Sequence, residues 1–155
     1  MDKALSQDPD YRVWVLLHQA RDVLHKVRER EVAEYGITAV QSAVLFVIYS
    51  NEGKVTPTLI SNWLLREPHT ISSIISRMEK LGLVEKTKKP GPNAELSITL
   101  TEKGRQAYHK IENIDLIREM LSCLSEEERK QLGSLLKRLR DKGLSYLLLQ
   151  KITFP

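Results

Sequence analysis

The stretch from residue 61 to residue 100 constrains the fold of this chain more than any other part. It reads SNWLLREPHTISSIISRMEKLGLVEKTKKPGPNAELSITL, which predicts a helix, a tight turn, a second helix and a β-hairpin. The second helix begins at Pro68 and is closed by Gly82. At about 100° per residue, its side chains divide into two opposite arcs. One arc is apolar and requires a core; it holds Ile71, Ile74, Ile75, Met78 and Leu81.

The opposite arc of this helix carries short polar side chains flanked by cations. Hydroxyl and imidazole groups can reach base edges, whereas arginine and lysine can reach phosphates or guanine. The pattern suits a helix that lies in the major groove of DNA, although surface helices with a merely solvated polar face share it. The candidate DNA-contacting residues are His69, Thr70, Ser72, Ser73, Ser76, Arg77 and Lys80.

The composition fits one domain with an oligomerisation appendage. The chain has 155 residues, a net charge of +4 and a pI near 9.2, a balance that leans towards a polyanionic partner. One cysteine excludes an internal disulfide and fits a reducing compartment. Because no apolar signal core opens the sequence and no run approaches a membrane span, we expect a cytoplasmic protein without membrane contact.

Local signals place further helices before this stretch. A long helix is predicted from about residue 9 to residue 34, with Asp8 as its N-cap and Gly36 available as a left-handed C-cap. Thr38 and Gln41 form a capping box that starts a second helix, and Thr56 followed by proline starts a third. These elements give the middle of the chain three helices and a hairpin, which can bury a core of their own.

After the hairpin, the sequence predicts two more long amphipathic helices. One is expected from Thr101 to about Leu121, and the last follows a capping box at Ser125 and Glu128, with Gly143 interrupting it as a candidate kink. Their apolar stripes, like that of the first helix, exceed what the middle can cover. A second copy of the chain is the simplest cover, and a monomeric bundle is the alternative. The candidate dimerisation residues are Leu139, Leu144, Leu147 and Leu148.

Two motifs at fixed spacing resemble a known family. RMEKLGLVEK spans residues 77–86, and LTEKG spans residues 100–104. Together with the order of elements, they resemble the multiple-antibiotic-resistance regulator (MarR) family of winged helix-turn-helix transcription factors, over almost the whole chain. In that family the first run ends the recognition helix and enters the wing, and the second leaves the wing and starts a dimerisation helix.

The resemblance implies a mainly α fold with a small β-hairpin wing, in which long dimerisation helices flank a winged helix-turn-helix. It assigns residues 1–36 and 101–155 to dimerisation and residues 37–100 to DNA binding. It also implies a homodimer that places two recognition helices in successive major grooves of double-stranded DNA. Family members commonly respond to small aromatic or phenolic ligands, and some respond to thiol oxidation or metal. No cofactor is implied.

The hairpin departs from the family pattern at its tip. The family's wing usually carries an acidic residue and, two positions later, an arginine that enters the minor groove, and these positions hold Pro92 and Ala94 here. The wing contacts left to this chain are Lys86, Lys88, Lys89 and the Asn93 amide.

Other constellations offer weaker alternatives. His18, Asp22, His25 and Glu29 form a stripe on the first helix, but the two histidines are about 10 Å apart along the axis, so they cannot share one metal ion and a solvated stripe is expected. Cys123 is a candidate redox switch, although a buried, inert thiol fits its surroundings better.

The aromatic side chains and the catalytic motifs also leave alternatives. The side chains of Trp14, Tyr35, Tyr49 and Trp63 could line a pocket, but core packing is the expected role. No catalytic spacing suggests an enzyme. The competing function is a winged-helix protein-interaction module whose basic wing binds an acidic partner. The serine-rich arc favours DNA, because protein interfaces prefer aromatic anchors.

Overall fold

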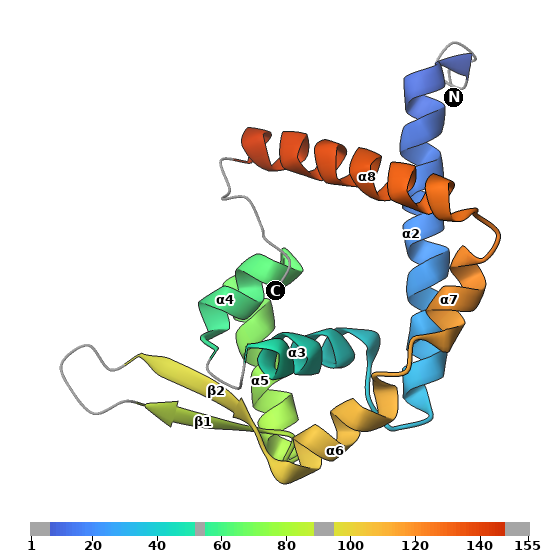
Figure 1. The fold of residues 1–155 in the computed structure, drawn as a ribbon. Helices are drawn as coiled ribbons and strands as arrows, with labels where there is room; N and C mark the ends of the chain where they lie inside the picture. The colour runs from blue at the N-terminus through green and yellow to red at the C-terminus, as the bar shows by residue number, and fades with distance from the viewer. Residues whose placement is uncertain (1–6, 52–54, 89–94, 148–155) are drawn as a thin grey trace. The chain divides into compact units, whose positions relative to one another are not determined.

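The structure is a computed structural model that describes residues 7–51, 55–88 and 95–147 (Figure 1). It confirms a mainly helical chain with one antiparallel hairpin. The chain forms two compact units, residues 1–43 and 44–155. The elements are α2 (Pro9–Ala33), α3 (Ala39–Ser50), α4 (Pro57–Leu64), α5 (Pro68–Lys80), β1 (Val84–Lys88), β2 (Leu96–Leu100), α6 (Glu102–Ile111), α7 (Asp115–Leu121) and α8 (Glu126–Tyr146).

In the first unit, helix α2 begins and ends where the local signals predict. The Asp8 carboxylate accepts hydrogen bonds from the backbone N–H groups of Asp10 and Tyr11, each at 2.9 Å. These bonds satisfy two donors that a helix N-terminus leaves without partners. Beyond the other end, Gly36 has a φ of +72°, a conformation that costs glycine little.

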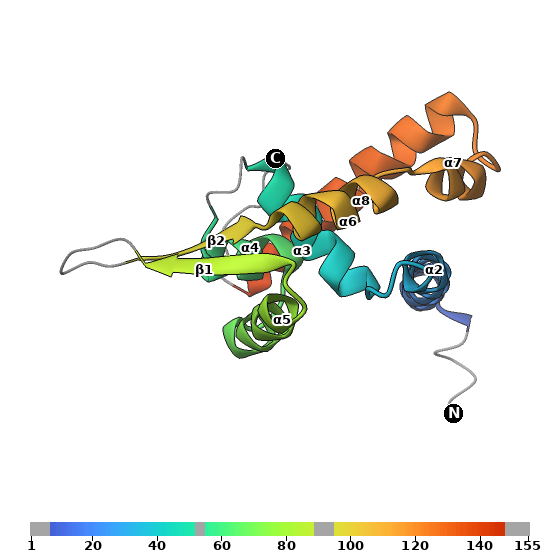
Figure 2. The same ribbon diagram turned by 90° about the horizontal axis from the view of Figure 1, so that it is seen from below.

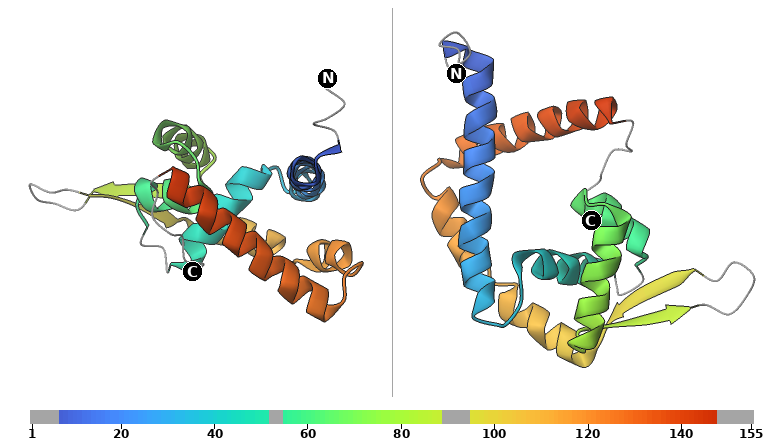
Figure 3. Two further views of the ribbon diagram at one scale, coloured as in Figure 1. Left: turned by 90° about the horizontal axis from the view of Figure 1, so that it is seen from above. Right: turned by 180° about the vertical axis from the view of Figure 1, so that it is seen from behind.

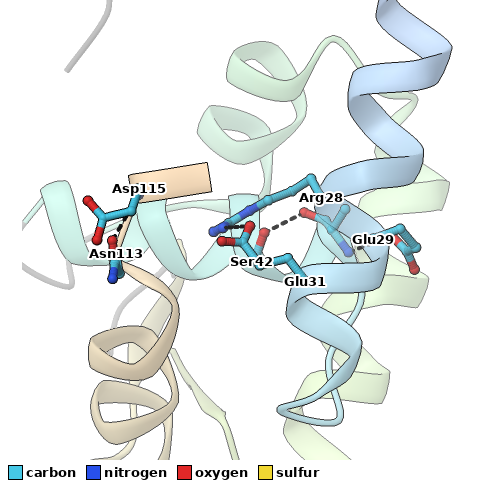
Figure 4. A network of polar contacts seen from close by, with 7 residues as sticks. Arg28, Glu29, Glu31, Ser42, Asn113 and Asp115 are labelled. Atoms are coloured by element: carbon cyan, nitrogen blue, oxygen red, sulfur yellow. Dashed lines mark hydrogen bonds and ion pairs between the residues drawn. The ribbon is translucent and has the colours of Figure 1, made fainter. Parts of the chain in front are cut away.

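The start of α3 is tied to α2 by polar contacts within the first unit (Figure 4). The Glu29 carboxylate accepts from the Ala39 N–H at 2.7 Å, and the Ser42 hydroxyl donates to the Ala39 carbonyl at 2.8 Å. The predicted capping box is present, since the side chains of Thr38 and Gln41 each bond the other's backbone N–H. Glu29 therefore has a capping role. Of the predicted stripe, His18 and Asp22 are exposed to solvent, whereas His25 and Glu29 are half-buried.

In the second unit, a small apolar core joins the end of α3 to α4, α5 and the hairpin. Strand β1 pairs with β2 from Val84 opposite Leu100 to Lys88 opposite Leu96. Val55 extends the sheet by a bridge to Ile98, whose N–H donates to the Val55 carbonyl at 2.7 Å. The fully buried side chains of this core are Val44, Leu45, Val47, Ile48, Val55, Ile60, Ile71, Ile75, Met78, Val84 and Ile98.

The prediction of one helix from residue 101 to residue 121 is wrong. Helix α6 ends at Ile111 and α7 starts at Asp115. The Asn113 side chain accepts from the Asp115 N–H at 2.8 Å (Figure 4), and the intervening Ile114 has φ −112° and ψ 22°. Asparagine interrupts the helix here because its side-chain amide offers the backbone a local alternative to the helical bond.

Helix α8 runs unbroken from Glu126 to Tyr146, so the predicted interruption at Gly143 is also wrong. The predicted capping box at its start is confirmed. Ser125 Oγ accepts from the Glu128 N–H at 3.2 Å, and the Glu128 carboxylate accepts from the Ser125 N–H at 2.7 Å.

This capping box predicts a pH-dependent contribution to stability. The backbone N–H of Ser125, and then its side chain, lower the pKa of Glu128 below its ordinary 4.5. A carboxyl with a lowered folded-state pKa stabilises the fold above pH 4.5, and this contribution is lost as the pH falls through the folded-state value. We expect the free energy of unfolding of Glu128→Gln, which keeps an acceptor but does not titrate, to depend less on pH between 3 and 5. Urea unfolding of both proteins across that range measures the difference, and parallel curves would contradict the expectation.

Candidate nucleic-acid interface

Helices α4 and α5 form a helix-turn-helix, in which α5 packs on both α4 and β1 (Figures 2 and 3). Thr56 caps α4, and Leu65 ends it in a left-handed conformation, φ 51° and ψ 45°, that glycine more commonly adopts. Ser61 then holds the turn, because its hydroxyl donates to the Arg66 carbonyl and its carbonyl accepts from the Arg66 N–H at 3.1 Å. Pro68 starts α5 as its first residue.

The two arcs predicted for α5 are present with one difference. Ile71, Ile75 and Met78 are buried, and Ile74 is half-buried. Leu81, expected on the apolar arc, is instead 45 % exposed because α5 ends at the residue before it. The inward arc therefore anchors the helix along most of its length.

The outward arc of α5 presents most of the predicted DNA-contacting side chains to solvent. Thr70 and Ser76 are half-buried. The exposed members are His69, Ser72, Ser73, Arg77 and Lys80. We call these five the outer arc. It combines hydroxyl and imidazole groups with two cations on a single helix face, which is the chemistry that base edges and phosphates require.

The wing residues predicted to contact DNA have different surroundings. Lys88 is exposed at the end of β1. Lys86 is half-buried, and its ammonium lies 2.8 Å from the Glu79 carboxylate and 3.0 Å from Ser76 Oγ. Lys89 and Asn93, and the departing positions 92 and 94, lie outside the described residues.

The LTEKG segment joins the wing to the end of α5. Thr101 Oγ1 donates to the Gly82 carbonyl at 2.6 Å and accepts from the Gly104 N–H at 3.0 Å. The Lys103 ammonium donates to the Leu81 carbonyl at 2.7 Å. The carbonyls that follow α5 are thus held by Thr101 and Lys103 at the start of α6, which gives the LTEKG motif a structural role.

The candidate dimerisation residues also differ in their exposure to solvent. Leu139 and Leu147 are exposed, Leu144 is buried, and Leu148 lies outside the described residues. Three further leucines of the predicted apolar stripe of this helix, which are not among the four candidates, are also exposed on the same side of α8; these are Leu132, Leu135 and Leu136.

Helix α2 also exposes large apolar side chains. Its exposed residues include Val13, Trp14, Leu16, Val23 and Leu24. The expected core role is therefore wrong for Trp14, and it is also wrong for Tyr35 and Tyr49, which are both more than two-fifths exposed. Trp63 is half-buried and packs against Phe46.

The structure also describes the surroundings of the candidate redox and metal-binding residues. Cys123 is exposed, contrary to the expected burial, and its Sγ donates to the Met120 carbonyl at 3.3 Å. His18 packs edge-on against Trp14. Within residues 7–51, 55–88 and 95–147, no three metal-ligating side chains gather, and no helix is long and apolar enough to cross a membrane.

Sequence reasoning did not find an aromatic cluster in the second unit. The rings of Tyr49 and Tyr108 stack at 4.1 Å between centroids, and His109 lies edge-on to Tyr49 at 5.5 Å. Burial, followed by the negative charge of Glu112, raises the pKa of Tyr108. The sequence shows adjacent aromatic side chains at Tyr108 and His109, but Tyr49, on which they pack, is 59 residues earlier than Tyr108 in the chain.

Comparison with known proteins identifies the fold built from these parts. The sequence profile of the MarR family matches residues 35–92, which include α3, α4, α5 and β1. This stretch of the chain is similar to the MarR family. Proteins of this family are transcriptional regulators rather than enzymes, and the helix-turn-helix with its hairpin has the winged-helix fold of the similar solved structures.

One curated relative is the HTH-type transcriptional regulator PecS of Dickeya dadantii, 30 % identical over 86 residues. That match covers 54 % of this chain, and the chain spans about half of the relative, 52 % of its length.

Solved structures share the fold over a longer span. The organohalide-sensing regulator RdhR in its 2,4-dichlorophenol-bound form matches with a TM-score of 0.86 and 24 % identity, covering 100 % of this chain and 96 % of that one. A cysteine-to-serine mutant of MarR from E. coli, complexed with operator DNA, matches with a TM-score of 0.77 and 23 % identity. That match covers 90 % of this chain and 99 % of the other.

Proposed function

We propose that this protein is a regulator of the MarR family, and that it is a homodimeric repressor that binds an inverted-repeat operator in double-stranded DNA. The observation that carries the proposal is the outer arc of α5, which lies opposite side chains buried in the core. Lys88 adds a cation at the wing. A rigid helix with donors, acceptors and cations on one exposed face matches the groove chemistry of DNA, and the relative solved with operator DNA shares its fold.

The dimer is supported by exposed apolar surface on α8 and on α2. Leu135 and Leu139 on α8 and the C-cap residue Leu147 are more than half exposed, as are Val13, Trp14 and Leu16 on α2. Contiguous exposed apolar residues on a helix are typical of interaction surfaces. A twofold dimer would cover them and present two copies of α5 to successive major grooves.

The proposed effector is a small aromatic or phenolic compound. The aromatic cluster of Tyr49, Tyr108 and His109 offers ring faces and edges, against which another ring can stack. The relative solved with 2,4-dichlorophenol supports this class. Adding that phenol to the protein–operator complex is expected to release DNA, and unchanged binding up to millimolar concentrations would contradict this part of the proposal.

The DNA-binding proposal is tested by selecting double-stranded oligonucleotides with the full-length protein. We expect an enriched inverted repeat whose half-sites are about 10–10.5 base pairs apart. A dimer that uses Arg77, Lys80, Lys88 and Lys89 of both chains neutralises roughly 6–10 phosphates, so log K should fall with log salt at a slope of several units. An acidic-partner module would bind heparin yet enrich no sequence.

Ser73 is expected to contribute to base preference rather than to overall affinity. Its hydroxyl is exposed on the outer arc and carries no charge. Ser73→Ala should lower the preference for the selected operator over random DNA by about tenfold, while binding to random DNA changes little. Ser134→Ala, an exposed position on α8, is the matched control. Equal losses of affinity on both DNAs would show that Ser73 does not read bases.

A further inference from the structure

Lys86 lies on the face of β1 that turns towards the core. The antiparallel register sets it opposite Ile98, which is completely buried. Opposed residues of an antiparallel pair lie on the same face of the sheet, and residues two apart on one strand share a face. Lys86 therefore shares its face with Ile98 and with the buried Val84, whereas Glu85 and Thr87 occupy the other, exposed face.

From this face, the Lys86 side chain reaches across to helix α5. Its ammonium makes an ion pair with the Glu79 carboxylate at 2.8 Å and a hydrogen bond with Ser76 Oγ at 3.0 Å. Ser76 and Glu79 are three residues apart, so their side chains are neighbours on one side of the helix. Lys86 retains only 25 % exposure, compared with 43 % for Glu79. The cation is thus already neutralised by a neighbouring carboxylate.

The hydrogen bond also fixes the chemical character of Ser76. An ammonium group can only donate, so the Ser76 oxygen must be the acceptor. One of its lone pairs is then occupied, while its own O–H hydrogen stays available to donate. A serine hydroxyl next to an ammonium is thereby biased towards contacting acceptors, and the charge strengthens its donor hydrogen. In the major groove such acceptors are guanine O6 and N7, adenine N7 and thymine O4.

We propose that Lys86 is a positioning residue for operator recognition, which holds the wing against α5 and presents Ser76 as a hydrogen-bond donor to a base acceptor. This inference rests on the proposed DNA-binding function. It assigns Lys86 to sequence preference rather than to phosphate neutralisation. The expected phosphate contact of the strand is Lys88, which lies two residues further along the same face and is exposed.

The proposal is tested by comparing base preference and salt dependence in matched variants of the full-length protein. Lys86→Met combined with Glu79→Gln removes the ion pair without changing the net charge, and methionine preserves an unbranched apolar side chain. This double variant and Ser76→Ala should each lose about tenfold discrimination at the same operator position, where wild type prefers an acceptor. Adding Ser76→Ala to the double variant should cause no further loss, because both changes remove one contact.

The salt slope separates positioning from phosphate contact. The neutral double variant should keep the wild-type slope, whereas Lys88→Met should reduce it by about one unit per subunit and weaken all sequences equally. Lys86→Arg, which retains a cationic donor, should preserve the operator preference. Far-UV circular dichroism establishes that each variant is folded, and Ser76→Ala tests the base contact even if loss of the ion pair unfolds the wing.

The outcomes distinguish this inference from the function on which it rests. If wild type enriches no sequence, the DNA-binding proposal itself fails. If wild type enriches an operator and Ser76→Ala keeps the same preference, the Lys86 inference alone is overturned. It is also overturned if Lys86→Met with Glu79→Gln lowers the salt slope as much as Lys88→Met does.

Discussion

Gly104→Ala is expected to lower the free energy of unfolding by about 3 kcal/mol, because the new methyl group overlaps backbone atoms. A Cβ at this position would lie 2.0 Å from the Leu83 carbonyl oxygen and 3.0 Å from its carbon. The segment cannot retreat easily, since Thr101 and Lys103 hold the carbonyls of the two preceding residues, Gly82 and Leu81. Because these bonds connect the end of α5 to α6, the variant should also weaken operator binding.

Gly133→Ala is the matched control for this prediction. Gly133 lies inside α8, and a Cβ there would meet no atom within 4 Å apart from its chain neighbours and the backbone of the helix itself. Alanine should raise the free energy of unfolding by up to about 1 kcal/mol, because it loses less backbone entropy than glycine in a helix. Urea unfolding with both variants measures the contrast. Equal effects of the two substitutions would show that the close approach to Leu83 does not constrain residue 104.

The parts of the fold that the sequence predicted are those set by neighbouring residues. Asp8, Thr38, Thr56 and Ser125 each cap a helix within the next few residues, and all four caps are present as predicted. The inward arc of α5 follows from the 3.6-residue period alone. Local rules also failed where two competed, because the Asn113 side chain breaks a helix that the apolar spacing of residues 101–121 had made continuous.

The candidate site was harder to predict wherever a partner came from a distant part of the chain. The local sequence does not distinguish Lys86 from Lys88, because both are lysines of the same strand. The hairpin register nevertheless places Lys86, and not Lys88, against Glu79 and Ser76. Similarly, the buried Leu144 and the exposed Leu139 belong to one leucine-rich run. Spacing identifies the helix face of such residues, but the packing of other elements decides which of them remain available to a partner.

The largest effect on DNA binding is expected from a change at the proposed dimer face. Leu139 is 54 % exposed in the middle of the leucine stripe of α8. Leu139→Lys removes an apolar side chain and places a charge at the interface twice, once in each protomer. Losing about 2 kcal/mol of apolar burial from each copy raises the dimer dissociation constant by roughly a thousandfold. Sedimentation at micromolar concentration should therefore find monomer where the unmodified chain gives dimer.

The same variant separates the dimer from electrostatics in operator binding. Leu139→Lys adds positive charge, which by itself would favour DNA. Ser134→Lys adds the same charge at an exposed position about 140° away on α8 and should leave both the dimer and its operator affinity intact. If Leu139→Lys still binds an inverted repeat more tightly than a single half-site, the two copies of α5 are coupled by some other surface. The expected result is equal, weak affinity for both DNAs, because a monomer can engage only one half-site at a time.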